Sequence, residues 1–276
     1  MKRIISLFSR FGTNLLSLFR KPAYKSEVTA RFPYLNQNDR EHMKSLAIKL
    51  LRRSGGEVFY GPLSGMKIPE TCFLATRPIW IVGCYEQELE QTFSDIISNP
   101  PEQIIDIGSA YGYYMVGLAL QTKTTILIGF EADADTHWRE AEALAVLNGV
   151  SDRIIQKGCC TIQSLREVLK NACVVISDCE GAEVDLLDPS QIPALKTCQI
   201  ICEMHDFYIK GATSILIDRF KASHKIRVIH ESKRDPFQFR ILDGLSDTDK
   251  FLAVRETKHI QGRLTSSRFL VMTPFS

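Results

Sequence analysis

From residue 100 onward, short apolar runs alternate with amphipathic segments. The runs are apolar on both faces, as parallel strands buried between two layers of helices must be. They cover residues 104–107, 125–130, 174–177 and 199–202, with a further short strand at 153–155. Helical patterns between them cover residues 112–121, 134–148, 162–170 and 182–188. This alternation predicts a doubly wound α/β fold, with ligands at the carboxyl ends of the strands.

Two further strand-like segments, residues 226–229 and 268–273, follow the last alternating unit. An antiparallel strand pair that closes the sheet would explain this tail. We therefore predict a mostly parallel seven-stranded sheet with helices on both faces.

The segment before the sheet has a different pattern. Residues 38–53 have helical spacing, and the paired glycines Gly55 and Gly56 end that helix. A turn-rich stretch then leads to the apolar residues 79–82, which we predict as short strands and loops. We expect residues 26–82 to form a small N-terminal helical cap on a main domain of residues 83–276.

The first 25 residues have a charge pattern of their own. Six basic residues and no acidic residue precede Glu27, so the rest of the chain carries −4 within a net charge of +2. Helical spacing places apolar side chains on one stripe: Ile4, Phe8, Phe11, Leu15 and Leu18. Two interpretations stay open: a helix that packs on its own domain, or an interfacial helix that attaches the protein reversibly to an anionic membrane.

Composition narrows the class of protein. The chain has 276 residues, of which 45% are hydrophobic and 24% charged, as in ordinary soluble globular proteins. A net charge of +2 gives no global basic field, so we expect no nucleic-acid partner. No apolar run reaches the length of a membrane span, and the eight cysteines do not form the paired C-x-x-C motifs of a zinc ribbon. We expect a reduced, cytoplasmic setting.

The first chemical signal follows the strand at 104–107. There Asp106 precedes Gly108 and Gly112, whose missing side chains allow a tight turn and a close approach to a ligand. The G-x-G-x-x-G motif of dinucleotide-binding enzymes is not met, because Ala110 and Tyr113 occupy its second and third glycine positions. The loop indicates a ligand with an ammonium group rather than a pyrophosphate, which disfavours a nicotinamide enzyme.

The second signal is an acid at the end of the second strand. Glu131 lies 23 residues beyond Gly108, close to the spacing at which an acid meets the ribose diol of a nucleoside in α/β sheets. A carboxylate can accept hydrogen bonds from both hydroxyls. Asp133 is better suited to begin the following helix, so we assign the ribose to Glu131.

The third signal is a set of polar residues at the ends of strands 174–177 and 199–202: Asp178, Glu180, Glu203 and His205. Their convergence at one edge of the sheet predicts a functional site. The alternative is that Glu180 and Glu183 only line the start of a helix, where acids are favoured. These side chains could hold magnesium or manganese better than zinc. The sequence alone leads us to assign no metal ligand.

Taken together, these motifs resemble those of the FkbM family of S-adenosylmethionine-dependent methyltransferases, a class I group with a Rossmann-like fold. The resemblance covers residues 83–206 well and the tail loosely. The segments that match the family are GCYE at 83–86, IDIGSAYGYY at 105–114, GFEA at 129–132, DCEGAE at 178–183 and ICEMH at 201–205. The sequence departs from the family at Ser109, at Ala132-Asp133 and at Cys179.

The resemblance implies S-adenosylmethionine as cofactor. Asp106, Gly108 and Gly112 would contact its methionine part and Glu131 its ribose, Tyr85 and Glu86 would border the site, and Ser109 and Asp178 complete the expected set.

The expected reaction is O-methylation of a hydroxyl on a small molecule, a sugar or a glycolipid. His205 would be the general base, and Asp178 would orient the hydroxyl or share that role. The alternatives are a non-catalytic S-adenosylmethionine-binding module and a methyltransferase that acts on a protein or RNA.

Overall fold

The computed structural model of the chain describes residues 37–133, 135–256, 258–260, 263–265 and 268–275. The basic segment 1–25 lies outside the described residues, so both interpretations of it stay predictions. Among the helices that the structure describes, none is long and apolar enough to cross a membrane.

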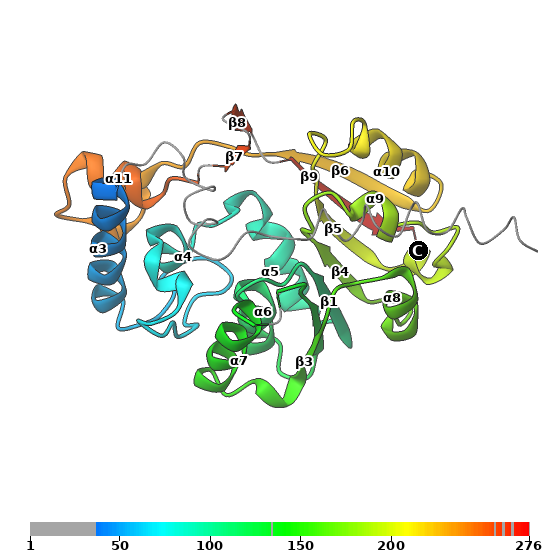
Figure 1. Cartoon of the computed structure of the whole chain (residues 1–276), viewed down its shortest axis with the longest axis horizontal. Helices are drawn as coiled ribbons and strands as arrows, with labels where there is room; N and C mark the ends of the chain where they lie inside the picture. Colours follow the sequence, from blue (N-terminus) through cyan, green and yellow to red (C-terminus); the bar gives the residue numbers. More distant parts are fainter. Residues whose placement is uncertain (1–36, 134, 257, 261–262, 266–267, 276) are drawn as a thin grey trace, which may run out of the picture.

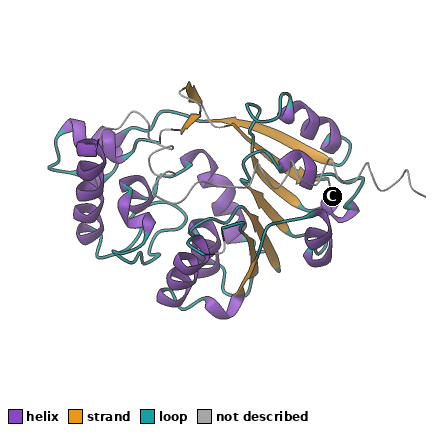
Figure 2. Cartoon of the chain, in the orientation of Figure 1, coloured by secondary structure: helices purple, strands orange, loops and turns teal. Residues whose placement is uncertain are grey.

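A seven-stranded sheet organises the molecule (Figures 1 and 2). Its strands are β1 (Gln103–Ile107), β2 (Ile126–Phe130), β3 (Ile154–Lys157), β4 (Val174–Ser177), β5 (Gln199–Glu203), β6 (His224–His230) and β9 (Arg268–Pro274). They lie in the order β3-β2-β1-β4-β5-β9-β6. The first five are parallel, and β9 runs antiparallel between β5 and β6, which confirms the predicted sheet and its closing pair. A separate two-stranded sheet pairs β7 (Lys258–Ile260) with β8 (Arg263–Thr265).

The register of the central strands brings the predicted site residues to one edge. Ile107 at the end of β1 pairs with Phe130 of β2 on one side and with Ser177 of β4 on the other, and Ser177 pairs with Cys202 of β5. The residues beyond these positions therefore emerge together: Gly108, Glu131, Asp178 and Glu203. The strand order reverses between β1 and β4, and a doubly wound sheet binds its ligand at such a point.

Alternating side chains of the strands divide the interior into two cores. Ile104 and Val174 belong to one core, and their neighbours Ile105 and Val175 belong to the other. The first core is covered by α5 (Glu90–Ser98), α6 (Tyr113–Gln121) and α7 (His137–Leu147). The second is covered by α8 (Ile162–Val168), α9 (Glu183–Leu186) and α10 (Ala212–Phe220). Helices on both faces explain why the strands are apolar throughout.

The cap is built from segments far apart in the chain. It contains α3 (Gln37–Arg53), η1 (Phe73–Thr76), α4 (Pro78–Val82) and η2 (Gln87–Leu89), together with the later η5 (Pro236–Gln238), η6 (Arg240–Leu242) and α11 (Asp247–Ala253). In Figure 1, α11 lies beside α3. Arg53 of α3 donates to the carbonyl oxygens of Ile241 and Asp243, at 2.6 and 2.8 Å. Contacts therefore link the early cap to residues of the predicted main domain, and the domain boundary at residue 83 stays a proposal.

Two local predictions were wrong. Residues 79–82, predicted as strands and loops, lie in the α-helix α4, whose five residues are all buried. Burial on every side erases the amphipathic pattern, while Pro78 at the helix start and Gly83 with φ of 86° at its end mark its limits. The helix expected from residue 134 begins at His137, and Asp133 instead accepts a hydrogen bond from the Thr136 N–H.

The connections are completed by two short 3₁₀ segments, η3 (Ser151–Arg153) and η4 (Pro193–Thr197). All eight cysteines are free thiols in the structure.

Candidate active site

The loop after β1 crosses the loop after β4 at close range. Gly108 has φ of +87°, and a Cβ placed on it would lie 1.9 Å from the carbonyl oxygen of Asp178. Its N–H donates to Phe130 of β2 at 2.8 Å. Glycine is therefore required at position 108 for backbone shape and for the contact with β4, whatever ligand the loop holds.

Gly112 and Ser109 have structural reasons of their own. Gly112 caps α6 with φ of +81°, and a Cβ there would lie 2.9 Å from the Cβ of Ala141 on α7. Buried Ser109 donates its N–H to Phe130 at 3.0 Å. Both residues shape the predicted cofactor loop, and direct contact with a cofactor stays a prediction for each.

Three buried carboxyl groups surround this loop: Glu86, Asp106 and Glu131. Burial, reinforced by the charges of Glu131 and Glu86, raises the pKa of Asp106 to about 7. Carboxylates crowded together in a buried place repel one another. A ligand that brings positive charge would relieve this repulsion.

Glu131 is held by the loops on either side of it. Its Oε2 accepts from the Ala110 N–H at 2.9 Å, and its Oε1 accepts from the Asp133 N–H at 2.8 Å. An ionised carboxylate has about four acceptor positions, and the two hydroxyls of a ribose diol would donate to such a group. The structure thus places Glu131 against the glycine-containing loop, and its contact with a ribose stays a prediction.

Buried His137 is a residue that sequence reasoning missed at this end of the site. Its Nδ1 lies 3.2 Å from Glu131 Oε1, and its ring lies 4.3 Å from the ring of Tyr111, centroid to centroid. No motif marks His137. The only signal is its place in the helix that follows the strand carrying Glu131.

Glu86 is positioned by side chains distant in sequence. Its Oε2 accepts from the Tyr114 hydroxyl at 2.5 Å, and its N–H donates to Glu256 Oε2 at 3.2 Å. Arg234 pairs with Glu256 and, at 3.1 Å, with Glu88, and all three of these side chains are almost fully buried. This network attaches the late segment of the cap to the loop that carries Glu86.

Tyr85 belongs to an aromatic cluster. Its ring lies 5.7 Å from Trp80, 5.8 Å from Tyr113 and 6.0 Å from Tyr114, between ring centroids. Tyr85 and Glu86 are thus joined to the loop through Tyr114, which contacts both. Whether Tyr85 also borders the cofactor stays a prediction.

The structure brings the polar residues after β4 and β5 together around one imidazole. His205 Nε2 lies 3.5 Å from Asp178 Oδ1 and 3.8 Å from Glu180 Oε2, while its Nδ1 lies 2.7 Å from Glu183 Oε1. Asp178, Glu203 and His205 each offer a polar atom within 4.8 Å of the other two. The predicted convergence at this edge of the sheet is therefore present in the structure.

Glu183 has a larger part in this cluster than its sequence position indicated. It is the first residue of α9, as the helix-start interpretation had it, yet it is fully buried. Its Oε1 also accepts from the N–H groups of Cys179 and Gly181, at 3.1 and 3.3 Å. Although burial favours the neutral acid, the bond from His205 holds the pKa of Glu183 below its usual value.

The charge of His205 follows from the same surroundings. Burial opposes a charged ring, but the bond to Glu183 and the charges of Asp178, Glu183 and Glu203 outweigh it and raise the pKa of His205 to about 9. The imidazole is therefore protonated on both nitrogens and positively charged at neutral pH.

The cluster has an aromatic border that the sequence patterns did not reveal. Phe207 and Tyr208 are exposed, and their ring centroids lie 4.2 Å apart. Both rings lie within 6.0 Å of the His205 ring. Exposed aromatic rings beside polar groups are well suited to bind a ligand with both apolar and polar faces.

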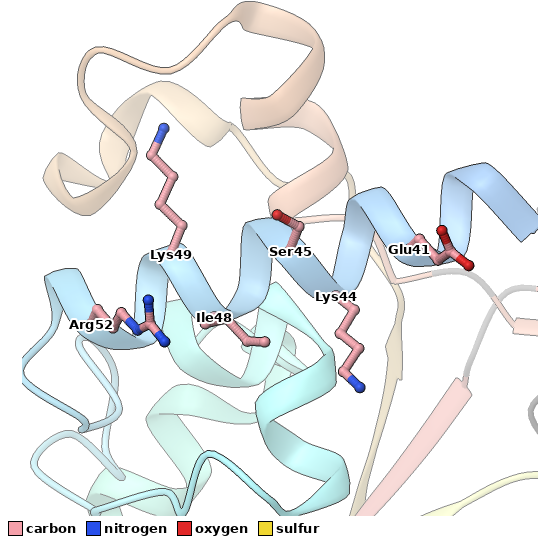
Figure 3. Close-up of a pocket in the computed structure, with 6 residues that line it drawn as sticks. All are labelled: Glu41, Lys44, Ser45, Ile48, Lys49 and Arg52. Carbon is pink, nitrogen blue, oxygen red and sulfur yellow. The ribbon is translucent and has the colours of Figure 1, made fainter.

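A concave surface lies on the cap. It runs along α3 and is lined by Glu41, Lys44, Ser45, Ile48, Lys49 and Arg52 (Figure 3). None of these residues belongs to the glycine-containing loop or to the strand ends, so the chemistry at the sheet edge does not involve this surface.

Comparison with known proteins gives matches only at the level of structure. No protein-family model and no curated protein matches the sequence. The N-terminal domain of human METTL16 in complex with SAH is 17% identical, covers 88% of this chain and 85% of its own, and has a TM-score of 0.47. A human methyltransferase 10 domain containing protein is 18% identical, with coverage of 87% and 98% and a TM-score of 0.47.

The O-methyltransferase from Bacillus cereus in complex with SAH is 12% identical, with coverage of 83% and 91% and a TM-score of 0.43. These three structures are all of methyltransferases, and their sequence identity to this chain is low.

Proposed function

We propose that this protein is an S-adenosylmethionine-dependent methyltransferase of the FkbM type that methylates a hydroxyl group. The observation that carries the proposal is the set of three buried carboxyl groups around the loop after β1, at the point where the strand order reverses. S-adenosylmethionine brings an ammonium group and a sulfonium centre, both positive. The pyrophosphate of a nicotinamide dinucleotide would instead be repelled by these acids.

The residues divide between two parts of the cofactor and the acceptor. We assign Asp106 and Glu86 to the ammonium group and Glu131 to the ribose diol. Asp178 and His205 face the acceptor from the ends of β4 and β5. There the carboxylate of Asp178 and the fraction of His205 that has lost its Nε2 proton share the removal of the hydroxyl proton. Methyl transfer is an in-line displacement, so alignment and proton removal are what the protein has to supply.

Phe207 and Tyr208 support an acceptor of mixed character. A sugar ring has apolar faces that stack on aromatic rings and hydroxyls that donate to carboxylates. We therefore propose a small molecule, a sugar or a glycolipid as the acceptor. If residues 1–25 bind membranes, a glycolipid becomes the preferred member of this group.

Equilibrium binding of S-adenosylhomocysteine (SAH) and of NAD to the full chain tests the cofactor assignment. We expect saturable binding of SAH and none of NAD, and the reverse would contradict the proposal. Incubating metabolite and lipid extracts with isotopically labelled S-adenosylmethionine then tests turnover. A labelled product identifies an enzyme, whereas SAH binding without any product would indicate a non-catalytic module.

Replacing Glu131 with alanine should weaken SAH binding by about 1 to 3 kcal/mol, the usual loss for a charge-assisted hydrogen-bonding partner. Calorimetric titration with SAH measures this loss of binding free energy. Glu131→Asp should lose part of this amount, and Glu142→Ala, which removes an exposed acid from α7, should lose none. Unchanged affinity in Glu131→Ala would remove Glu131 from the ribose site.

Cofactor affinity should rise with pH up to about 7. Below the raised pKa of Asp106 the free protein holds a proton there, and the ammonium group can pair with Asp106 only after that proton leaves. Each pH unit below 7 should therefore weaken S-adenosylmethionine binding by up to about tenfold. Titration between pH 5.5 and 7.5 measures the slope, which Asp106→Asn should abolish along with most of the affinity.

The same group predicts the opposite trend for the ligand-free fold. Because folding raises the pKa of Asp106, the folded protein favours the protonated side chain. The resulting contribution to stability is fully present below the pKa of the unfolded chain and is lost as pH rises through about 7. Asp106→Asn should consequently raise the melting temperature of the ligand-free protein at pH 8. A lower melting temperature would show that the carboxylate has a stabilising partner there.

A further inference from the structure

The side chains at the ends of β4 and β5 have the composition and spacing of a divalent cation site. Asp178 and Glu203 offer carboxylate oxygens and His205 an imidazole nitrogen, all within 4.8 Å of one another. Ligand atoms at about 2.0 to 2.6 Å from one ion lie at most about 4 to 5 Å apart. The three donors therefore need little rearrangement to share a cation.

The orientation of His205 is an independent observation that points the same way. The ring is about nineteen-twentieths buried, and its Nδ1–H donates to Glu183, a carboxylate outside the three donors. Nε2 is thereby directed toward Asp178, 3.5 Å away. Metal-binding histidines characteristically donate their second N–H to a carboxylate in this manner, which determines the tautomer and the ring orientation.

We propose that Asp178, Glu203 and His205 bind one divalent cation, with Glu183 as a positioning residue. Two oxygen donors and one nitrogen donor suit Mn²⁺. Mg²⁺ prefers oxygen ligands alone, and structural Zn²⁺ prefers nitrogen and sulfur. A cation at this position replaces the proton on His205 Nε2, because a ligand nitrogen must be unprotonated to bind.

The position of the site would allow the cation to activate the acceptor hydroxyl. This role rests on the proposed function. Asp178 adjoins the cofactor loop, since its carbonyl oxygen lies where a Cβ of Gly108 would be. With the cation bound, Asp178 and His205 are its ligands and do not act as bases, and an acceptor hydroxyl near the cation loses its proton to water more readily. Its oxygen then bonds to the methyl carbon while the carbon–sulfur bond breaks, and SAH leaves as a neutral thioether.

Manganese binding can be measured without any methyl transfer. The full chain, stripped with a chelator, is titrated with Mn²⁺ and the free ion is followed by its electron paramagnetic resonance signal. We expect about one ion bound per chain, with nitrogen hyperfine coupling from His205 in the bound form. Mg²⁺ added in excess should compete.

Variants test each assigned part. Asp178→Asn, Glu203→Gln and His205→Ala should each weaken Mn²⁺ binding at least about tenfold, and His205→Ala should also remove the nitrogen coupling. Glu183→Gln should weaken binding about 10- to 100-fold, the usual effect of losing the carboxylate behind a ligating histidine. Asp218→Asn removes an exposed carboxylate on α10 and serves as the matched control, with unchanged affinity expected. Circular dichroism confirms that each variant is folded.

The outcomes separate the two proposals. Wild-type protein that binds SAH but no Mn²⁺ would overturn the cation site and leave the methyltransferase proposal standing. Mn²⁺ binding without SAH binding would do the reverse. Binding that survives in both folded Asp178→Asn and folded Glu203→Gln with unchanged affinity would place the ion elsewhere and overturn the assignment.

Discussion

Gly108→Val should abolish SAH binding and lower the free energy of unfolding by about 3 to 5 kcal/mol. A Cβ at this position would lie 1.9 Å from the Asp178 carbonyl oxygen, and the neighbouring atom is backbone, which cannot rotate away. The φ of +87° adds strain for any side chain, and most of all for a β-branched one. Either the loop after β1 or the loop after β4 must move, and both carry site residues.

Gly149 provides the matched control for this prediction. It also has a positive φ, of +67°, but a Cβ there would meet nothing within 4 Å. Gly149→Val should therefore show the backbone strain alone, about 1 to 3 kcal/mol, and keep its affinity for SAH. Calorimetry and chemical denaturation measure both quantities. Normal SAH binding by Gly108→Val would mean that this loop is only a turn.

His205→Ala should reduce turnover by about 10²- to 10⁴-fold with a much smaller change in cofactor affinity. That range is the usual contribution of a group positioned for proton transfer. The variant also leaves the carboxyl groups of Asp178, Glu183 and Glu203 without the imidazole that lies among them. Single-turnover rates with labelled cofactor measure the chemical step, once an acceptor has been found by the extract screen.

Companion variants identify which group takes the proton. Asp178→Asn should also damage turnover, and Glu183→Gln should cause an intermediate loss because it only orients the ring. His230, an exposed residue at the end of β6, supplies a control whose change to alanine should leave turnover intact. If His205→Ala turned over normally while Asp178→Asn were inactive, the role of base would belong to Asp178 alone.

Prediction from the sequence succeeded where a feature is encoded locally. Buried parallel strands are marked by short apolar runs, and the glycine that follows β1 is marked by the strand before it and the helix after it. The parallel arrangement then brings Asp178, Glu203 and His205 to the same edge without knowledge of any side-chain contact. Prediction from the sequence failed at α4, because a helix buried on all sides has no polar face to reveal its period.

What only the tertiary structure decided is how distant side chains meet. The sequence by itself determined the sheet, its carboxyl edge and the acids that lie there, because periodicity and strand ends depend on neighbouring residues. It could not show that Glu256, 170 residues from Glu86, accepts its N–H, or that Glu183 orients His205 from a buried position. Such contacts depend on how whole elements pack, and packing brings together residues whose spacing along the chain has no regular period. For that reason the position of the glycine-containing loop after β1 was predictable, whereas the charge of His205 and the geometry of the proposed cation site required the fold.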